Sequence, residues 1–137
     1  MKVLIIGGVA GGATAAARLR RLDEQAEIVI LERSGFVSYA NCGLPYYIGG
    51  VIEDKEDLTL QTPESFWRRF RIDVRVGHEA LRIDPENKTV TIRRLEDGTL
   101  YETAYDKLIL SPGAKAVRPE LPGIDHERIF TLRTVED

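Results

Sequence analysis

The sequence has 137 residues and a mass of 15.4 kDa, the size of one domain, so two independent domains are not expected. Hydrophobic residues make up 43% and charged residues 30%, a composition that excludes a disordered or collagen-like chain. The 19 basic and 22 acidic residues give a net charge of −3, so we expect neither a nucleic-acid partner nor an anionic membrane partner.

The use of cysteine and histidine limits the chemistry further. Cys42 is the single cysteine, which excludes an internal disulfide and a thiolate zinc site and indicates a reducing, cytoplasmic location. His78 and His126 are isolated, so no metal site is expected. The apolar run 3–6 is too short for a membrane span or a signal peptide.

The beginning of the chain has the pattern of a βαβ unit. Residues 2–6 form a β-branched run that predicts a buried strand, and the alanine-rich residues 9–22 predict a helix. Residues 26–31 are a second apolar run and predict the next strand. A strand, a glycine turn, a helix and a strand therefore follow one another at the spacing of a parallel crossover.

A loop with short helices and then a third strand are predicted next. Residues 33–50 are typical of a loop in which a short helix begins near Asn41 or Cys42. Thr62 is a candidate N-cap and Pro63 a first helical residue, which predicts a helix to about residue 70. Residues 72–76 predict a third parallel strand.

The second half of the chain predicts an antiparallel meander before the last strand. Segments 79–83, 89–94 and 100–103 alternate and are separated by turn residues. Residues 107–110 predict a buried strand, and residues 114–137 predict no element. The fold class is thus α/β, a parallel sheet with helices on both faces and an inserted three-stranded meander. Because such a sheet needs further strands at its edge, we expect the chain to be a portion of a longer protein.

The glycine turn between the first strand and helix is a candidate nucleotide site, since backbone N–H groups at a helix N-terminus bind phosphate. Its residues are Gly7, Gly8, Val9, Ala10, Gly11 and Gly12. Val9 occupies the middle position of the dinucleotide fingerprint, where glycine is usual. Glu32 nevertheless supports the match, because it ends the second strand, where an acidic residue accepts hydrogen bonds from the ribose hydroxyl groups. The pattern favours FAD or NAD without separating them, and the alternative is a turn that serves only helix packing.

Cys42 is the candidate redox residue. At the start of a helix its thiolate would be favoured, and Ser38 and Asn41 offer hydrogen bonds nearby. The alternative is a cysteine that packs as a small hydrophobic residue.

Three features occur together and in order: the turn Gly7 to Ala13, Glu32, and the segment Ser38-Tyr-Ala-Asn-Cys-Gly-Leu-Pro-Tyr46. With these, the chain resembles the coenzyme A-disulfide reductase branch of the FAD-dependent pyridine nucleotide-disulfide oxidoreductases, which uses a single cysteine. The resemblance covers essentially all 137 residues, including His78-Glu79 and the run from Leu108 to Ala114. It implies a Rossmann-like FAD-binding domain of which residues 1–137 are the N-terminal part, without the NAD(P)H-binding and dimerisation domains. A homodimeric full-length protein is implied as well.

The resemblance also implies roles for individual residues. FAD would be held by Gly7 to Gly12, Glu32, Arg33, Ala80, Ser111, Pro112 and Gly113. Coenzyme A would be held by Thr14, Arg18, Arg21, Ser38 and Asn41 and would form a mixed disulfide with Cys42. Helical spacing puts residues 14, 18 and 21 on one face, where two guanidinium groups suit phosphate, although an ordinary solvated basic face is the alternative. A second basic cluster, Arg68, Arg69 and Arg71, is interpreted as packing and left out of the site.

The leading hypothesis is an NAD(P)H-dependent flavoenzyme that reduces a small-molecule substrate, coenzyme A disulfide or a coenzyme A persulfide or polysulfide. The first alternative is an NADH oxidase or peroxidase of the same superfamily, in which Cys42 cycles through a sulfenic acid. An alternative of another class is a non-catalytic nucleotide-binding domain with a buried Cys42. The 137 residues alone are expected to retain FAD weakly and to lack turnover.

Overall fold

The computed structural model describes all 137 residues and is built on a four-stranded parallel sheet. The strand order is β3-β2-β1-β7, with β1 at Lys2–Ile6, β2 at Glu27–Glu32, β3 at Asp73–Val76 and β7 at Lys107–Leu110. β1 is central and pairs in parallel with β2 on one side and with β7 on the other. Strands buried on both faces need apolar residues throughout, which is why β1 and β2 read as continuous hydrophobic runs.

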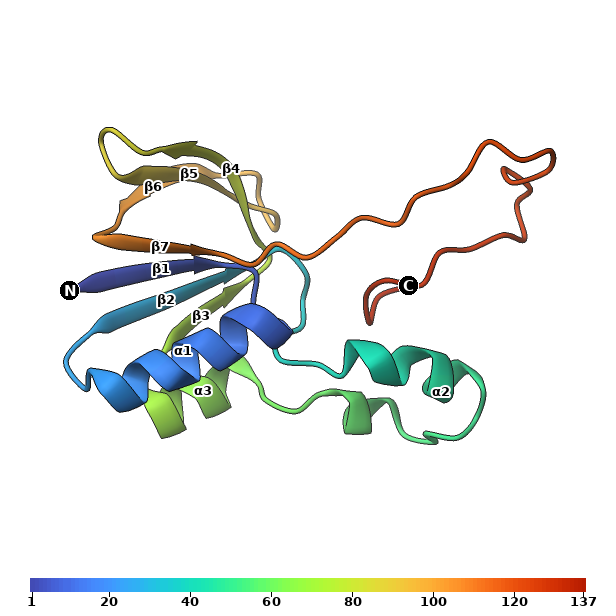
Figure 1. Ribbon diagram of the computed structural model, residues 1–137, viewed down its shortest axis with the longest axis horizontal. Coiled ribbons are helices and arrows are strands. Elements are labelled where there is room, and N and C mark those ends of the chain that lie inside the picture. Colours follow the sequence, from blue (N-terminus) through green and yellow to red (C-terminus); the bar gives the residue numbers. More distant parts are fainter.

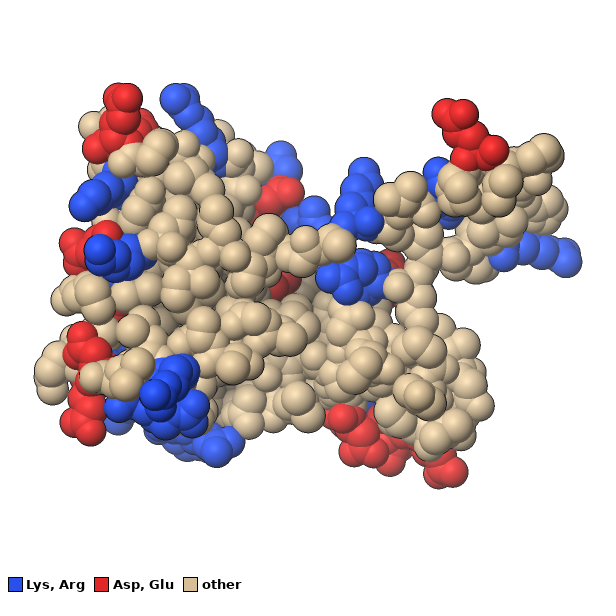
Figure 2. All heavy atoms as spheres, in the orientation of Figure 1, with Lys and Arg blue, Asp and Glu red and all other residues tan.

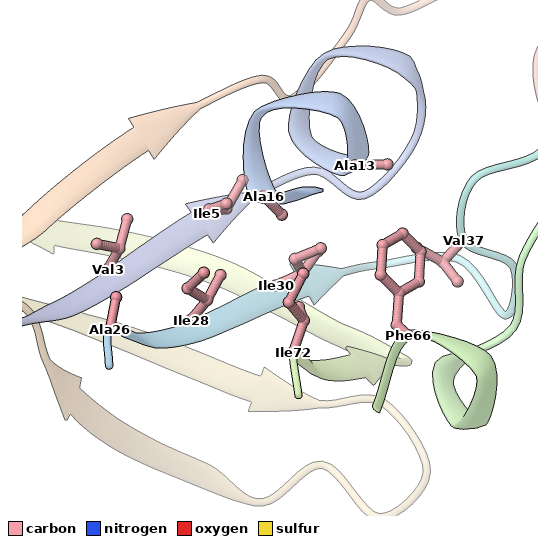
Figure 3. Packing of buried hydrophobic residues seen from close by; sticks show 10 residues of the cluster. All are labelled: Val3, Ile5, Ala13, Ala16, Ala26, Ile28, Ile30, Val37, Phe66 and Ile72. Atoms are coloured by element: carbon pink, nitrogen blue, oxygen red, sulfur yellow. The ribbon is translucent and has the colours of Figure 1, made fainter. Parts of the chain in front are cut away.

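Helices α1 (Ala10–Leu22) and α3 (Pro63–Phe70) cover one face of this sheet (Figure 1). Val3, Ile5 and Ile30 point from the strands toward Ala13 and Ala16 of α1, whose small side chains let the helix approach closely (Figure 3). Phe66 of α3 completes the cluster at 2% exposure. The helix face of the sheet is therefore a continuous apolar layer.

The other face is covered by the meander, an antiparallel sheet of order β4-β5-β6. β4 spans His78–Asp84, β5 spans Thr89–Arg94 and β6 spans Leu100–Ala104, and the β4–β5 register shifts between Ala80 and Arg82. Val90 and Ile92 of β5 pack on Leu4 and Leu31 of the parallel sheet, all at 1% exposure or less. The predicted fold class is confirmed with one difference. The second face of the sheet carries strands where helices were predicted, because the meander folds back over it.

The local predictions for the helices hold closely. Thr62 caps α3 in a reciprocal pair with Ser65, and Pro63 is its first residue, as the sequence predicts. A 3-10 turn at Asn41–Gly43 leads into α2 at Leu44–Ile48, and a second 3-10 turn spans Lys55–Leu58. These segments lie beyond the N-terminal end of α1 (Figure 1).

After β7 the chain forms a long arm without helix or strand, which leaves the sheet and then turns back toward α2 (Figure 1). The returning end is anchored by Val135, 5% exposed, in a cluster with Tyr39, Leu44 and Leu58. The helices of the chain are all too short or too polar to cross a membrane.

The packing of Leu4 gives a prediction for stability. Leu4 is fully buried between the parallel sheet and the meander, so Leu4→Ala removes buried methyl groups and leaves a cavity. We expect the free energy of unfolding to fall by about 2–5 kcal/mol in urea denaturation. Leu22→Ala is the matched control, because Leu22 is 67% exposed at the end of α1, and it should change stability by less than about 0.5 kcal/mol. Equal losses in the two variants would contradict this account of the core.

Candidate nucleotide cleft and cysteine turn

An open cleft of about 790 Å³ lies at the carboxyl ends of β1, β2 and β7. This edge of a parallel sheet is where α/β proteins bind ligands. The predicted cofactor residues that line it are Gly7, Val9, Glu32, Arg33, Ala80, Ser111, Pro112 and Gly113. They come from segments far apart in the sequence, so the fold gathers most of the predicted cofactor residues around one space.

The glycine loop is packed tightly against the end of β7. Gly7 has φ of +96°, and a Cβ built there would lie 2.0 Å from the carbonyl oxygen of Ser111. A Cβ on Gly12 would lie 1.8 Å from the carbonyl oxygen of Gly7. The Ser111 hydroxyl donates to that same Gly7 oxygen at 3.1 Å. Only glycine fits at positions 7 and 12, and the loop geometry depends on both.

The N-terminus of α1 has no side chain that caps it. Val9 is the N-cap residue and offers no side-chain acceptor, and the first turn contains no acidic residue. The first N–H groups of a helix have no partner within the helix and carry partial positive charge. Ala10, Gly11 and Gly12 of the predicted set are the residues of this turn. An uncapped, glycine-rich helix start suits an anion such as a pyrophosphate.

Glu32 is held in a fixed orientation at the end of β2. Its carboxylate accepts the Gly8 N–H at 2.7 Å on Oε2, and the Ser34 N–H and hydroxyl at 2.8 and 2.9 Å on Oε1. The residue is 8% exposed and lines the cleft. A carboxylate offers about four acceptor positions, so Oε2 retains one for a ligand hydroxyl.

Gly8 also joins the glycine loop to the segment that carries the cysteine. Its carbonyl oxygen accepts the Ser38 N–H at 2.9 Å, and Ser38 has φ of +50°, an uncommon value for a residue with a side chain. The Ser38 carbonyl in turn accepts the Leu60 N–H at 3.1 Å. Both peptide groups of Ser38 are thus fixed.

Cys42 is exposed in the 3-10 turn that precedes α2. A cysteine that packs as a small hydrophobic residue is therefore not what the structure shows. Its neighbour Asn41 donates through Nδ2 to the carbonyl oxygen of Arg133 at 3.1 Å. Cys42, Ser38 and Asn41 lie outside the residues that line the cleft, in the segment next to it.

The predicted basic face of α1 is free of internal partners. Thr14, Arg18 and Arg21 are exposed, and neither arginine forms a hydrogen bond or an ion pair with another residue of the chain. Arg20 behaves differently, because its guanidinium donates to the carbonyl oxygens of Phe70, Asp23, Glu24 and Arg71 and ties α1 to α3. Lys and Arg side chains gather over α1 and α3 in Figure 2.

Several residues of the cleft were missed by the sequence analysis: Ser34, Tyr39, Glu79 and Arg133. Burial, followed by the charge of Glu32, raises the pKa of the Tyr39 phenol. Glu79 forms ion pairs with Arg93 at 2.6 Å and Arg33 at 3.9 Å. Glu79 follows the predicted third strand and Ser34 follows Glu32, so proximity to the strand ends could have identified both. No local pattern indicates Arg133, which reaches the cleft only because the arm turns back.

These features define the class of protein. A βαβ unit with a glycine turn, an uncapped helix start and an oriented acidic residue after β2 forms a Rossmann-type dinucleotide-binding domain. The residues fit an adenine dinucleotide, because Gly7 lines the cleft next to the uncapped start of α1 and Glu32 retains an acceptor for a free 2′-hydroxyl.

Comparison with known proteins gives the family. The model of the pyridine nucleotide-disulphide oxidoreductases matches residues 1–137. The coenzyme A disulfide reductase of Staphylococcus aureus is 45% identical over 136 residues, which are 99% of this chain and 30% of that protein. The chain belongs to the pyridine nucleotide-disulphide oxidoreductase family, which confirms the resemblance seen in the sequence.

Solved structures agree in fold. The structure of reduced CoADR-RHD from Bacillus anthracis is 52% identical with a TM-score of 0.94, and covers 98% of this chain and 24% of that one. The water-forming NADH oxidase from Lactobacillus brevis, solved with NADH, is 31% identical with a TM-score of 0.88, and covers 98% of this chain and 30% of that one. A protein described as CoADR-RHD and a water-forming NADH oxidase therefore share this fold, so the fold alone does not distinguish the two activities.

The glycine loop gives a second prediction. Gly12→Ala places a methyl group against the Gly7 carbonyl and the Ser111 hydroxyl, whereas Gly11→Ala meets only the Ser111 Cβ at 3.2 Å. We expect Gly12→Ala to lower the unfolding free energy by about 2 kcal/mol or more and to weaken FAD binding below the wild-type level in a flavin fluorescence titration. Gly11→Ala is the matched control and should retain both properties better. If Gly12→Ala bound FAD as the wild type does, the loop would not have the proposed role.

Proposed function

We propose that the chain is the N-terminal part of the FAD-binding domain of an NAD(P)H-dependent reductase of coenzyme A disulfide, or of a coenzyme A persulfide, with Cys42 as the redox residue. The observation that carries this proposal is the exposure of the single cysteine in a fixed turn beside a dinucleotide cleft. The 45% identity to a coenzyme A disulfide reductase supports it. The chain spans about 30% of the length of that relative, so NAD(P)H binding, homodimerisation and a cytoplasmic location are parts of the proposal that concern a longer protein.

The cofactor side of the proposal assigns residues to FAD. The first turn of α1 and Gly7 would hold the pyrophosphate, Glu32 the ribose, and Arg33 and the backbone near Ala80 the adenine end. Ser111 to Gly113 would close the cleft at the end of β7. When bound there, FAD supplies two-electron reduction of a disulfide at the expense of NAD(P)H.

The substrate side of the proposal uses the surface between α2 and α1. Val9, at the N-cap of α1, packs on the cluster that contains Leu44 of α2, so the cysteine turn adjoins the N-terminal end of α1. Thr14, Arg18 and Arg21 then follow at increasing distance along that helix, a rise of about 10 Å at 1.5 Å per residue. A long, extended thiol with phosphates at its far end matches this arrangement, with the sulfur at Cys42 and phosphate at the guanidinium groups.

The exchange step needs only the thiolate of Cys42. Its Sγ attacks one sulfur of coenzyme A disulfide, the S–S bond of the substrate breaks, and one coenzyme A leaves as a thiolate. The new S–S bond joins Cys42 to the second coenzyme A. Two electrons from NAD(P)H and a proton then release that coenzyme A as a thiol and restore the Cys42 thiolate. No second cysteine of the chain is required.

The oxidase is the second candidate, and the similarity to the Lactobacillus brevis enzyme favours it. In that reaction Cys42 would carry a sulfenic acid formed by a peroxide, and no coenzyme A would be bound. The free arginines on α1 have no use in oxygen chemistry, and this supports the reductase.

The third prediction tests the adduct on Cys42. We expect the reduced chain, incubated with coenzyme A disulfide, to gain one coenzyme A on Cys42, seen by denatured intact mass and removed by a thiol reductant. The reaction should be at least about tenfold faster than with glutathione disulfide, because only coenzyme A presents phosphates to α1. Cys42→Ser is the control and should gain nothing.

Two outcomes would contradict the reductase. An unmodified thiol in coenzyme A disulfide, together with a stable oxygen adduct in dilute hydrogen peroxide, would identify the oxidase. Full cellular function in Cys42→Ser would identify a nucleotide-binding domain without cysteine chemistry.

The fourth prediction tests the basic face of α1. The double substitution Arg18→Gln and Arg21→Gln should slow adduct formation with coenzyme A disulfide about tenfold, since two phosphate contacts are lost. The rate with iodoacetamide should not change, because that reagent carries no phosphate. Arg82→Gln, an exposed arginine on β4, is the matched control for the loss of positive charge. An equal effect of Arg82→Gln would show that α1 is an ordinary solvated face.

A further inference from the structure

The end of the arm forms a compact turn that rejoins the body of the protein. The Asp137 carboxylate accepts the backbone N–H groups of Arg133 and Thr134, both at 2.7 Å. The Gly35 N–H donates to the Glu136 carboxylate at 2.7 Å. Residues 133–137, named here the strap, are therefore fixed both internally and to the loop after β2.

The strap packs directly on the segment that carries Cys42. Val135 is 5% exposed and lies in one cluster with Tyr39 and Leu44, which flank Cys42 in the sequence, and with Leu58. These four buried residues form a third hydrophobic cluster, separate from the clusters on the two faces of the parallel sheet. The cysteine turn thus has its own small core, and the strap supplies one of its four members.

The strap also contacts the Asn41 side chain, which interacts with the Tyr39 side chain as well. A carbonyl oxygen accepts hydrogen bonds only, so the contact between Asn41 and the Arg133 carbonyl, 3.1 Å, must use Nδ2. The Oδ1 atom of Asn41 forms no hydrogen bond with the chain, so this acceptor is free in the residue that precedes Cys42. The pantetheine arm of coenzyme A carries amide N–H donors close to its sulfur.

Arg133 links the strap to the cleft as well. Its Nε donates to the Ala114 carbonyl at 2.9 Å, and a Cβ built on Gly113 would lie 2.7 Å from Nη2 of its guanidinium. Arg133 and Thr134 both line the cleft. One residue therefore touches the nucleotide cleft with its side chain and the cysteine turn with its backbone.

We infer that the strap is a positioning element for the disulfide exchange at Cys42, with Val135 as its anchor and the Asn41 carboxamide as the group that it positions. This inference rests on the proposed function and adds to it a specificity device. The strap fixes Oδ1 of Asn41 toward an amide donor of the thiol substrate. Loss of the strap would leave the thiol of Cys42 intact but would reduce recognition of coenzyme A disulfide.

A double-mutant cycle on the intact 137-residue chain tests the inference. The rates of Cys42 with coenzyme A disulfide and with iodoacetamide are measured for the wild type, Val135→Ala, Asn41→Ala and the double variant. We expect Val135→Ala to slow the coenzyme A disulfide reaction about fivefold in the wild-type background and by less than about twofold in the Asn41→Ala background. The iodoacetamide rate of Val135→Ala should stay within about twofold of the wild-type rate, since that reagent needs only the thiolate.

Two further variants keep the test decisive. Val117→Ala makes the same change at an 86% exposed position of the arm and should alter neither rate. Glu136→Ala removes the acceptor of the Gly35 N–H from an exposed residue, so it loosens the strap without disturbing the core, and should slow the coenzyme A disulfide reaction selectively. If Val135→Ala unfolds the chain, Glu136→Ala still tests the role of the strap.

The outcomes separate the two proposals. If the wild type reacts with coenzyme A disulfide and the strap variants react equally fast, or if Val135→Ala has the same effect with and without Asn41, the strap inference is overturned and the proposed function stands. If the wild type reacts with iodoacetamide but not with coenzyme A disulfide, both are overturned.

Discussion

The contacts of one peptide unit, Gly8, organise the site. Its N–H donates to the buried Glu32 carboxylate, and its carbonyl accepts the Ser38 N–H. The first contact fixes the acidic residue at the end of β2, and the second fixes the segment that leads to Cys42. A Cβ at this position would lie 2.9 Å from Val37 and 3.3 Å from the Cβ of Glu32, so a side chain would push these elements apart. The cleft and the cysteine turn keep their relative positions because a glycine lies between them.

The sheet makes that arrangement rigid. β1 pairs on both sides, and its residues are buried between a helix layer and a strand layer. Because β1 is closely packed on both faces, it holds the glycine loop at its carboxyl end in a fixed position. The loop itself is closed by Ser111 at the end of the neighbouring strand β7. Binding groups on such a rigid sheet need little rearrangement when a ligand enters, and this preorganisation allows them to orient the ligand precisely.

The sequence predicted the features that depend on local physics. The βαβ unit follows from apolar runs and glycine, and the start of α3 follows from Thr62 and Pro63, because threonine is favoured as an N-cap and proline at the first helical position. The meander follows from alternation and turn residues. The cover of the second sheet face could not be predicted, since it depends on how the meander folds over the sheet rather than on its own pattern.

In the candidate site too, the sequence predicted the residues that belong to a local pattern but not those placed by distant contacts. Glu32 and the glycine turn lie at fixed positions of a known unit, so their meeting in one cleft follows from topology. The strap left no local signal, because residues 133–137 have no periodicity and Val135 is buried in a cluster with Tyr39, Leu44 and Leu58, which are distant in the sequence. The exposure of Cys42 was likewise open in the sequence, because a cysteine between polar and apolar neighbours is compatible with either environment.

A single cysteine imposes a demand on the rest of the proposed site. Where two cysteines lie on one chain, the second thiol stays at a high effective concentration because the backbone holds it. In the proposed reaction of Cys42, the partner sulfur would belong to a diffusible molecule, and only non-covalent contacts would hold it in place during reduction. Those contacts must come from groups with no other partner. The Arg18 and Arg21 side chains form no hydrogen bond or ion pair within the chain, and Asn41 donates to the strap through Nδ2 while its Oδ1 acceptor stays free. The substrate surface and the strap are thus what this chain offers in place of the second cysteine.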